Sequence, residues 1–86
     1  MSDWSLYILE CKDGSLYTGV TTDLEKRLKQ HNQGRASKYT SARKPVKVIY
    51  TESIGSESVA KKREAEVKKL SRKNKLRLIR CSVPRH

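Results

Sequence analysis

Apolar and polar residues alternate through two short runs near the N-terminus, residues 4–11 and 15–20. Alternation with a period of two is typical of a β-strand, and the glycine-containing connection at residues 12–14 indicates a β-hairpin. Two loop lengths fit this pattern. A two-residue turn places Tyr7 and Tyr17 on opposite faces of the hairpin, whereas a three-residue loop places them on the same face, because side chains alternate along a strand.

We favour the three-residue loop, with Gly14 in the left-handed conformation, because it collects the branched aliphatic residues on one face. That face is predicted to be the core face, and it consists of Leu6, Ile8, Leu16 and Val20. The opposite face carries Tyr7, Leu9, Tyr17 and Gly19. The missing side chain of the glycine leaves room there for another group to approach the two phenols closely.

A helix is predicted to follow the hairpin over residues 22–34. Thr22 and Glu25 have the spacing of a capping box, and the glycine at the far end is a typical helix stop. Arg27 and His31 are four residues apart, so they lie on one side of this helix, beside its narrow apolar stripe. Considered alone, Arg27 also fits a solvated charge on the helix surface. His31 also fits a residue near the C-terminal end of the helix that is favourable to the helix dipole.

Residues 35–45 combine several basic residues with one tyrosine and several hydroxyl groups, and they predict a loop. Such a composition suits phosphate contacts and stacking on a base, with a merely solvated loop as the alternative. The residues predicted to contact nucleic acid are Arg35, Lys38, Tyr39 and Arg43. The following residues 46–51 are β-branched and aromatic, which predicts a third strand beside the hairpin.

Ser56 is predicted to cap a second long helix, which ends near residue 70. Glu64 lies four residues after Ala60 and three before Val67, so it belongs to the inward stripe of that helix. A carboxylate at the buried edge of a small domain needs a cation, a hydrogen-bond donor or a metal. A structural ion pair is the alternative to a functional role, with Lys61 or Arg27 as the partner.

The chain of 86 residues suits a single domain with a lean core, which we place at about residues 4–80. From residue 71 the pattern predicts a short final helix or an extended lid over the core, and residues 81–86 are expected to fray. Cys11 and Cys81 have no metal-ligand spacing and are expected to be reduced. With no apolar signal segment, we expect an intracellular protein, cytoplasmic or, in a eukaryotic or viral setting, nuclear.

The charge balance points to a polyanionic partner, since 20 Lys and Arg residues oppose 9 Asp and Glu residues for a formal charge of +11. Nucleic acid fits better than a membrane, because no helix sets a broad apolar face against a basic one and no run is long enough to span a bilayer. Charge supplies affinity without sequence preference, so target selection is expected to need a protein partner.

The polar residues singled out above together suit hydrolysis of a phosphodiester bond. Glu64 can hold one hard divalent cation, Mg²⁺ or Mn²⁺, and Arg27 can bind a non-bridging phosphate oxygen through its fork of donors. Tyrosine ionises at a pKa of about 10 in water, and surrounding cations would lower that pKa and let a phenolate accept a proton from water.

Tyr7-Ile8 and Tyr17-Thr18-Gly19, followed by the helix with Arg27 and His31 and by the glutamate in KKREAEVKKL, resemble the GIY-YIG nuclease superfamily. The likeness is greatest to its small stand-alone members. It implies an α/β fold of the α+β type, with a three-stranded antiparallel sheet flanked by helices. It also implies an endonuclease that uses one divalent metal. The catalytic positions are then Tyr7, Tyr17, Arg27, His31 and Glu64.

In that resemblance Glu64 is the metal ligand, and a tyrosine activates the water, with Tyr17 favoured and Tyr7 in support. Gly19 and Asn74 match supporting positions. Leu6 and Thr18 replace the glycine and the isoleucine of the motif name, but both are predicted to face the core. DNA is the expected substrate, with RNA as an alternative. Two other functions stay open: a non-catalytic nucleic-acid-binding module, and a docking component of a repair or replication assembly.

Overall fold

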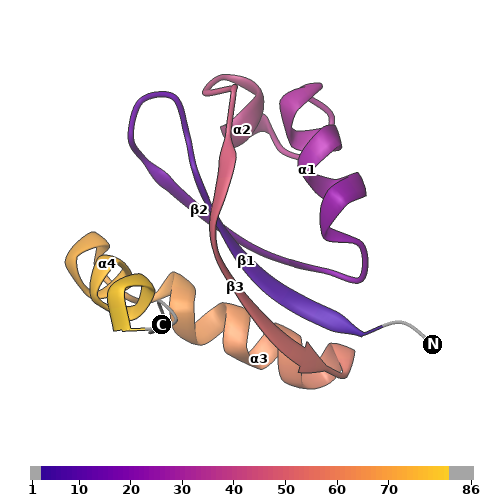
Figure 1. Ribbon diagram of the computed structural model, residues 1–86, viewed down its shortest axis with the longest axis vertical. Coiled ribbons are helices and arrows are strands. Elements are labelled where there is room, and N and C mark those ends of the chain that lie inside the picture. Colours follow the sequence, from indigo (N-terminus) through magenta and orange to yellow (C-terminus); the bar gives the residue numbers. More distant parts are fainter. Residues whose placement is uncertain (1–2, 82–86) are drawn as a thin grey trace, which may run out of the picture.

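A three-stranded antiparallel sheet with the strand order β2-β1-β3 forms the centre of the computed structural model, which describes residues 3–81 (Figure 1). Helices cover both faces of this sheet, with α1 and α2 on one side and α3 and α4 on the other. The predicted α+β architecture is therefore confirmed. The elements in chain order are β1 Trp4–Glu10, β2 Leu16–Thr21, α1 Leu24–Asn32, α2 Lys38–Ser41, β3 Lys47–Gly55, α3 Glu57–Lys68 and α4 Arg72–Cys81.

The hairpin has the three-residue loop that the aliphatic pattern favoured. The backbone N–H of Cys11 donates to the carbonyl of Ser15 at 2.9 Å, and Gly14 closes the turn by donating to the carbonyl of Cys11 at 2.9 Å. Gly14 has φ +86°, a conformation that residues with a side chain rarely adopt. In this register Tyr7 lies opposite Gly19, so both tyrosines point to the same face of the sheet.

The sheet has two cores, where the sequence predicted one. Leu6 and Ile8 are completely buried on the face covered by α3 and α4. The tyrosine face is also buried, because α1 and α2 pack on it and leave Tyr7 only 3% exposed. The signal was the unbroken apolar run from Leu6 to Leu9, since a strand covered on both faces loses its alternation.

Several element ends differ from the prediction. Asp23, not Thr22, caps α1 by accepting a hydrogen bond from the backbone N–H of Lys26 at 3.1 Å. The predicted loop at 35–45 contains the single-turn helix α2, capped by Ser37. Strand β3 continues to Gly55 because it pairs along the whole of β1, and pairing with a neighbour decides strand length more strongly than local propensity.

The C-terminal half follows the predicted helices closely. Ser56 caps α3, with its hydroxyl accepting from the backbone N–H of Val59, and the stretch after residue 71 is a helix rather than a lid. Cys81 ends α4, and the rest of the predicted frayed tail lies outside the described residues. Both cysteines are free, Cys11 buried and Cys81 exposed. Within residues 3–81, no helix is long and apolar enough to cross a membrane.

Candidate active site

Tyr7 lies directly over the backbone of Gly19 in the neighbouring strand. A Cβ atom at position 19 would stand 2.5 Å from the Tyr7 hydroxyl and 2.6 Å from Cζ, far inside van der Waals contact. The space left by the glycine is therefore filled by the tyrosine itself, not by a group from outside as the sequence suggested. The absence of a side chain at Gly19 lets the phenol pack closely against β2.

His31 joins Tyr7 to helix α2. Its Nε2 lies 2.9 Å from the Tyr7 hydroxyl, and its Nδ1 lies 2.7 Å from Oγ1 of Thr40. His31 does lie in the last turn of α1, as the helix-dipole alternative expected, but it is only 1% exposed and bonds through both ring nitrogens. Burial and the charge of Arg27 hold the pKa of His31 below its usual value, which favours the neutral imidazole at neutral pH.

The Tyr7 hydroxyl responds to the charged and phenolic candidates. Burial raises the pKa of Tyr7 well above its ordinary value, and the nearby Tyr17 raises it further. Arg27 lowers the same pKa and Glu64 raises it, so both lie close enough to act electrostatically on this phenol. Direct contacts join Tyr7 and Tyr17 to His31, and the charges of Arg27 and Glu64 act on Tyr7 from a greater distance.

Tyr17 lies between the rings of His31 and Tyr39. It meets the His31 ring edge to face at a centroid distance of 5.1 Å and stacks on Tyr39 at 5.9 Å. The guanidinium of Arg43 lies 3.9 Å over the Tyr39 ring, and its Nε also donates to Asp13 in the hairpin loop at 3.1 Å. The stacked contact and the cation–π contact fix the outer phenol against the inner one.

Glu64 comes from α3, on the inward stripe that the sequence predicted. Its side chain is 23% exposed, and its partner is Lys68, with Nζ 3.2 Å from Oε2, instead of Lys61 or Arg27. Because the half-buried Glu64 carboxylate already pairs with an ammonium group, it is suited to bind a cation. Among residues 3–81 no three His, Cys, Asp or Glu side chains cluster as a metal site, so a metal here would have one carboxylate and several waters, as Mg²⁺ commonly does.

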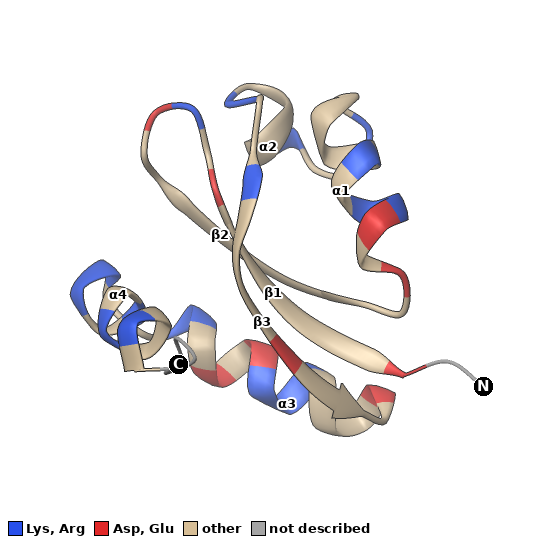
Figure 2. Ribbon diagram, in the orientation of Figure 1, with Lys and Arg blue, Asp and Glu red and all other residues tan. Residues whose placement is uncertain are grey.

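Among the predicted nucleic-acid contacts, Arg35 and Lys38 are exposed and Tyr39 is 38% exposed. Asn74 is exposed in the first turn of α4, where its backbone N–H donates to the Ser71 hydroxyl. Figure 2 shows that α4 carries basic residues and no acidic one. Basic residues therefore also lie on α4, which is on the opposite side of the sheet from α1 and α2.

Sequence reasoning missed two polar residues that build the site. Thr40 is completely buried against His31. It was missed because residues 35–45 were predicted to be a loop, in which a hydroxyl is expected to be solvated. Asn32 clamps the start of β3, accepting from the backbone N–H of Val46 at 2.7 Å and donating to its carbonyl at 3.2 Å. An amide at the end of a helix was the signal for such a backbone bridge.

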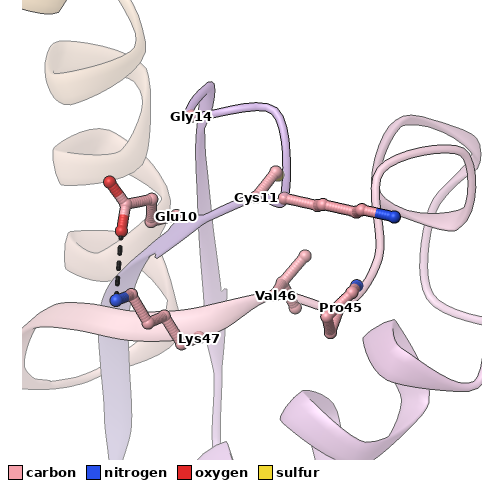
Figure 3. Close-up of a pocket in the computed structure, with 7 residues that line it drawn as sticks. Glu10, Cys11, Gly14, Pro45, Val46 and Lys47 are labelled. Atoms are coloured by element: carbon pink, nitrogen blue, oxygen red, sulfur yellow. Dashed lines mark ion pairs between the residues drawn. The ribbon is translucent and has the colours of Figure 1, made fainter.

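Two pockets flank this region. The first, about 380 Å³, lies beside the hairpin loop and the start of β3, where Lys47 pairs with Glu10 (Figure 3). It contains none of the five candidate catalytic residues. The second, about 310 Å³, is polar and is lined by Arg27 together with Thr21, Thr22, Asp23, Lys26 and Gln30. This pocket leaves open space beside Arg27.

The chain belongs to the GIY-YIG family, whose catalytic domain matches residues 3–77. It is 52% identical over 86 residues to a UPF0213 protein of Syntrophus aciditrophicus, a match that covers 99% of each chain. It is 53% identical over 74 residues to a UPF0213 protein of Staphylococcus saprophyticus, covering 86% of this chain and 90% of the relative.

Two solved structures are also similar. A UPF0213 protein from Bacillus halodurans has a TM-score of 0.61 at 45% identity, and the match covers 95% of this chain and 86% of that one. A protein from E. faecalis has a TM-score of 0.63 at 39% identity, covering 100% of this chain and 96% of that one. The family assignment supports a nuclease-like function on nucleic acid, and GIY-YIG nucleases generally use a divalent metal.

Proposed function

We propose that this protein is a single-domain, metal-dependent endonuclease that hydrolyses phosphodiester bonds, with DNA as the preferred substrate. The observation that carries the proposal is the surroundings of Tyr7. Its hydroxyl is hydrogen-bonded to a neutral histidine and lies within electrostatic reach of Tyr17, Arg27 and Glu64. A buried phenol that bonds to a histidine and is perturbed by charges of both signs is typical of a functional site.

Tyr7 is the tyrosine that we assign to water activation, in place of the Tyr17 favoured by sequence. A phenol with a raised pKa is a poor base alone, but it can accept the proton of a water while passing its own proton to Nε2 of His31. The water then attacks phosphorus as hydroxide and the imidazole becomes imidazolium. Tyr7 stays neutral throughout, so the cost of the step falls on His31, whose charged form is disfavoured by burial and by Arg27, and the negative charge of the bound phosphate offsets it.

Arg27 binds a non-bridging oxygen of the scissile phosphate and stabilises the negative charge that develops on it. A Mg²⁺ or Mn²⁺ ion held by Glu64 would polarise the same phosphate and offset charge on the leaving oxygen. Tyr17 packs against the His31 ring and orients it. Arg35, Lys38 and Arg43 supply phosphate contacts, and a base can stack on Tyr39 by taking the place of Arg43 over its ring.

Cleavage of labelled single-stranded, duplex and branched DNA, and of RNA, tests this proposal at low salt with Mg²⁺, Mn²⁺ or a chelator. Glu64→Gln and Tyr7→Phe are expected to lose cutting and to keep binding. Glu66→Gln is the matched control, because Glu66 is on the same helix and its side chain is 69% exposed. Cutting that survives in Glu64→Gln would contradict the metal site, and tight binding without cutting in any metal would favour the non-catalytic binding module.

A further inference from the structure

Thr40 is a buried hydroxyl that has no part in the mechanism described so far. It is 0% exposed, and Oγ1 lies 2.7 Å from Nδ1 of His31. On its other side the same hydroxyl can donate to the carbonyl of Ser37 at 3.4 Å. Thr40 therefore links the imidazole to the backbone of helix α2, within a chain of polar groups that begins at Tyr7.

The hydrogen bonds of this chain can be counted for each form of the neutral imidazole. With the hydrogen on Nδ1, the ring donates to Thr40, Thr40 donates to Ser37, and the Tyr7 phenol donates to Nε2. Each donor then has an acceptor. With the hydrogen on Nε2, the ring donates to Tyr7, and the phenolic hydrogen has no acceptor that the structure identifies among residues 3–81.

The first form is favoured because Tyr7 is buried, and a buried donor without an acceptor costs about 1–3 kcal/mol. The tautomer of His31 also decides whether proton transfer from Tyr7 can occur. Only an imidazole with a free Nε2 lone pair can take the proton of the Tyr7 phenol, and only then is the phenol oxygen free to accept a proton from water.

We propose that Thr40 is a positioning residue that holds His31 in the tautomer protonated at Nδ1, so that Nε2 receives the Tyr7 proton during water activation. This inference rests on the proposed nuclease function, although the tautomer itself does not depend on cleavage. Ser37 completes the arrangement, because its hydroxyl accepts from the Thr40 backbone N–H at 3.2 Å and its carbonyl accepts from the Thr40 hydroxyl. The basic turn α2 thus has a role inside the site as well as at its surface.

Long-range ¹H–¹⁵N correlation NMR reads the tautomer directly, since protonated and unprotonated ring nitrogens have distinct shifts. The wild-type protein at pH 8 is expected to show His31 protonated at Nδ1, with His86 assigned from a His86→Asn variant. Thr40→Val removes the acceptor, so that each tautomer leaves one donor unpaired and the preference for the hydrogen on Nδ1 is lost, while Thr40→Ser keeps the hydroxyl and the original tautomer. A wild-type ring protonated at Nε2 overturns the inference without any variant.

Cleavage kinetics provide the second readout. Thr40→Val is expected to lower kcat roughly 10- to 100-fold with little change in KM, and Thr40→Ser is expected to restore it. Thr18→Val is the matched control, being the same change at a buried threonine on the opposite face of the sheet. An unchanged tautomer and kcat in Thr40→Val overturns the inference, whereas the expected tautomers without any cutting overturn only the nuclease proposal.

Discussion

Gly19→Ala is the most direct test of how the sheet positions Tyr7. The new Cβ would meet the Tyr7 hydroxyl and Cζ at 2.5 and 2.6 Å. Ordinary carbon contacts lie at roughly 3.5–4.0 Å, so the ring has to move by about 1 Å. A shift of this size breaks the 2.9 Å hydrogen bond to His31.

The loss of stability in Gly19→Ala can be worked out from these contacts. Overpacking a core costs about 1–3 kcal/mol, and the lost hydrogen bond adds about 0.5–1.5 kcal/mol. Replacing glycine by alanine in an unstrained strand gains about 0.4–1 kcal/mol from the unfolded chain. We therefore expect Gly19→Ala to lower the free energy of unfolding by about 0.5–4 kcal/mol, and to reduce cleavage on the order of 100-fold because a misplaced group loses its alignment.

Urea unfolding of a double-mutant cycle measures the clash itself. The four proteins are the wild type, Gly19→Ala, Tyr7→Leu and the double variant, in which the shorter leucine leaves room for the new Cβ. The alanine should cost at least about 1 kcal/mol less in the Tyr7→Leu background than in the wild type. An equal cost in both backgrounds would refute the clash between residues 7 and 19.

Three further results are expected. Thr18→Val should raise the free energy of unfolding by about 1 kcal/mol, measured by urea unfolding, because within the described part of the chain Oγ1 of Thr18 is buried without a hydrogen-bond partner. The lowered pKa of His31 means that the unfolded chain binds more protons below about pH 6.5, so stability should fall from pH 7.5 to 5.5 and fall less in His31→Asn. Lys68→Met should tighten Mn²⁺ binding roughly two- to fivefold by electron paramagnetic resonance, since it frees Glu64 from an ion pair worth about 0.5–1 kcal/mol. Weaker Mn²⁺ binding in that variant would count against Glu64 as the ligand.

Local patterns predicted the elements well and their ends less well. The hairpin register followed from the alternation of aliphatic residues, since a slip by one residue would turn every side chain to the other face. The predicted cap of α1 was wrong by one residue. Thr22 and Asp23 are both good caps, and local sequence does not choose between them. The last four residues of β3 were missed because their strand state depends on pairing with β1.

The sequence by itself determined which residue types were available and which of them share a face. Periodicity placed Tyr7 beside Tyr17, Arg27 beside His31, and Glu64 on an inward stripe, because strand and helix geometry repeat over short distances. The ion pair of Lys68 with Glu64 is local, because the two residues are four apart on one helix. Tertiary structure alone decided the partners of His31, which are Tyr7 from β1 and Thr40 from α2. Such contacts join elements that are distant in the chain, so they arise only when the helices pack on the two faces of the sheet.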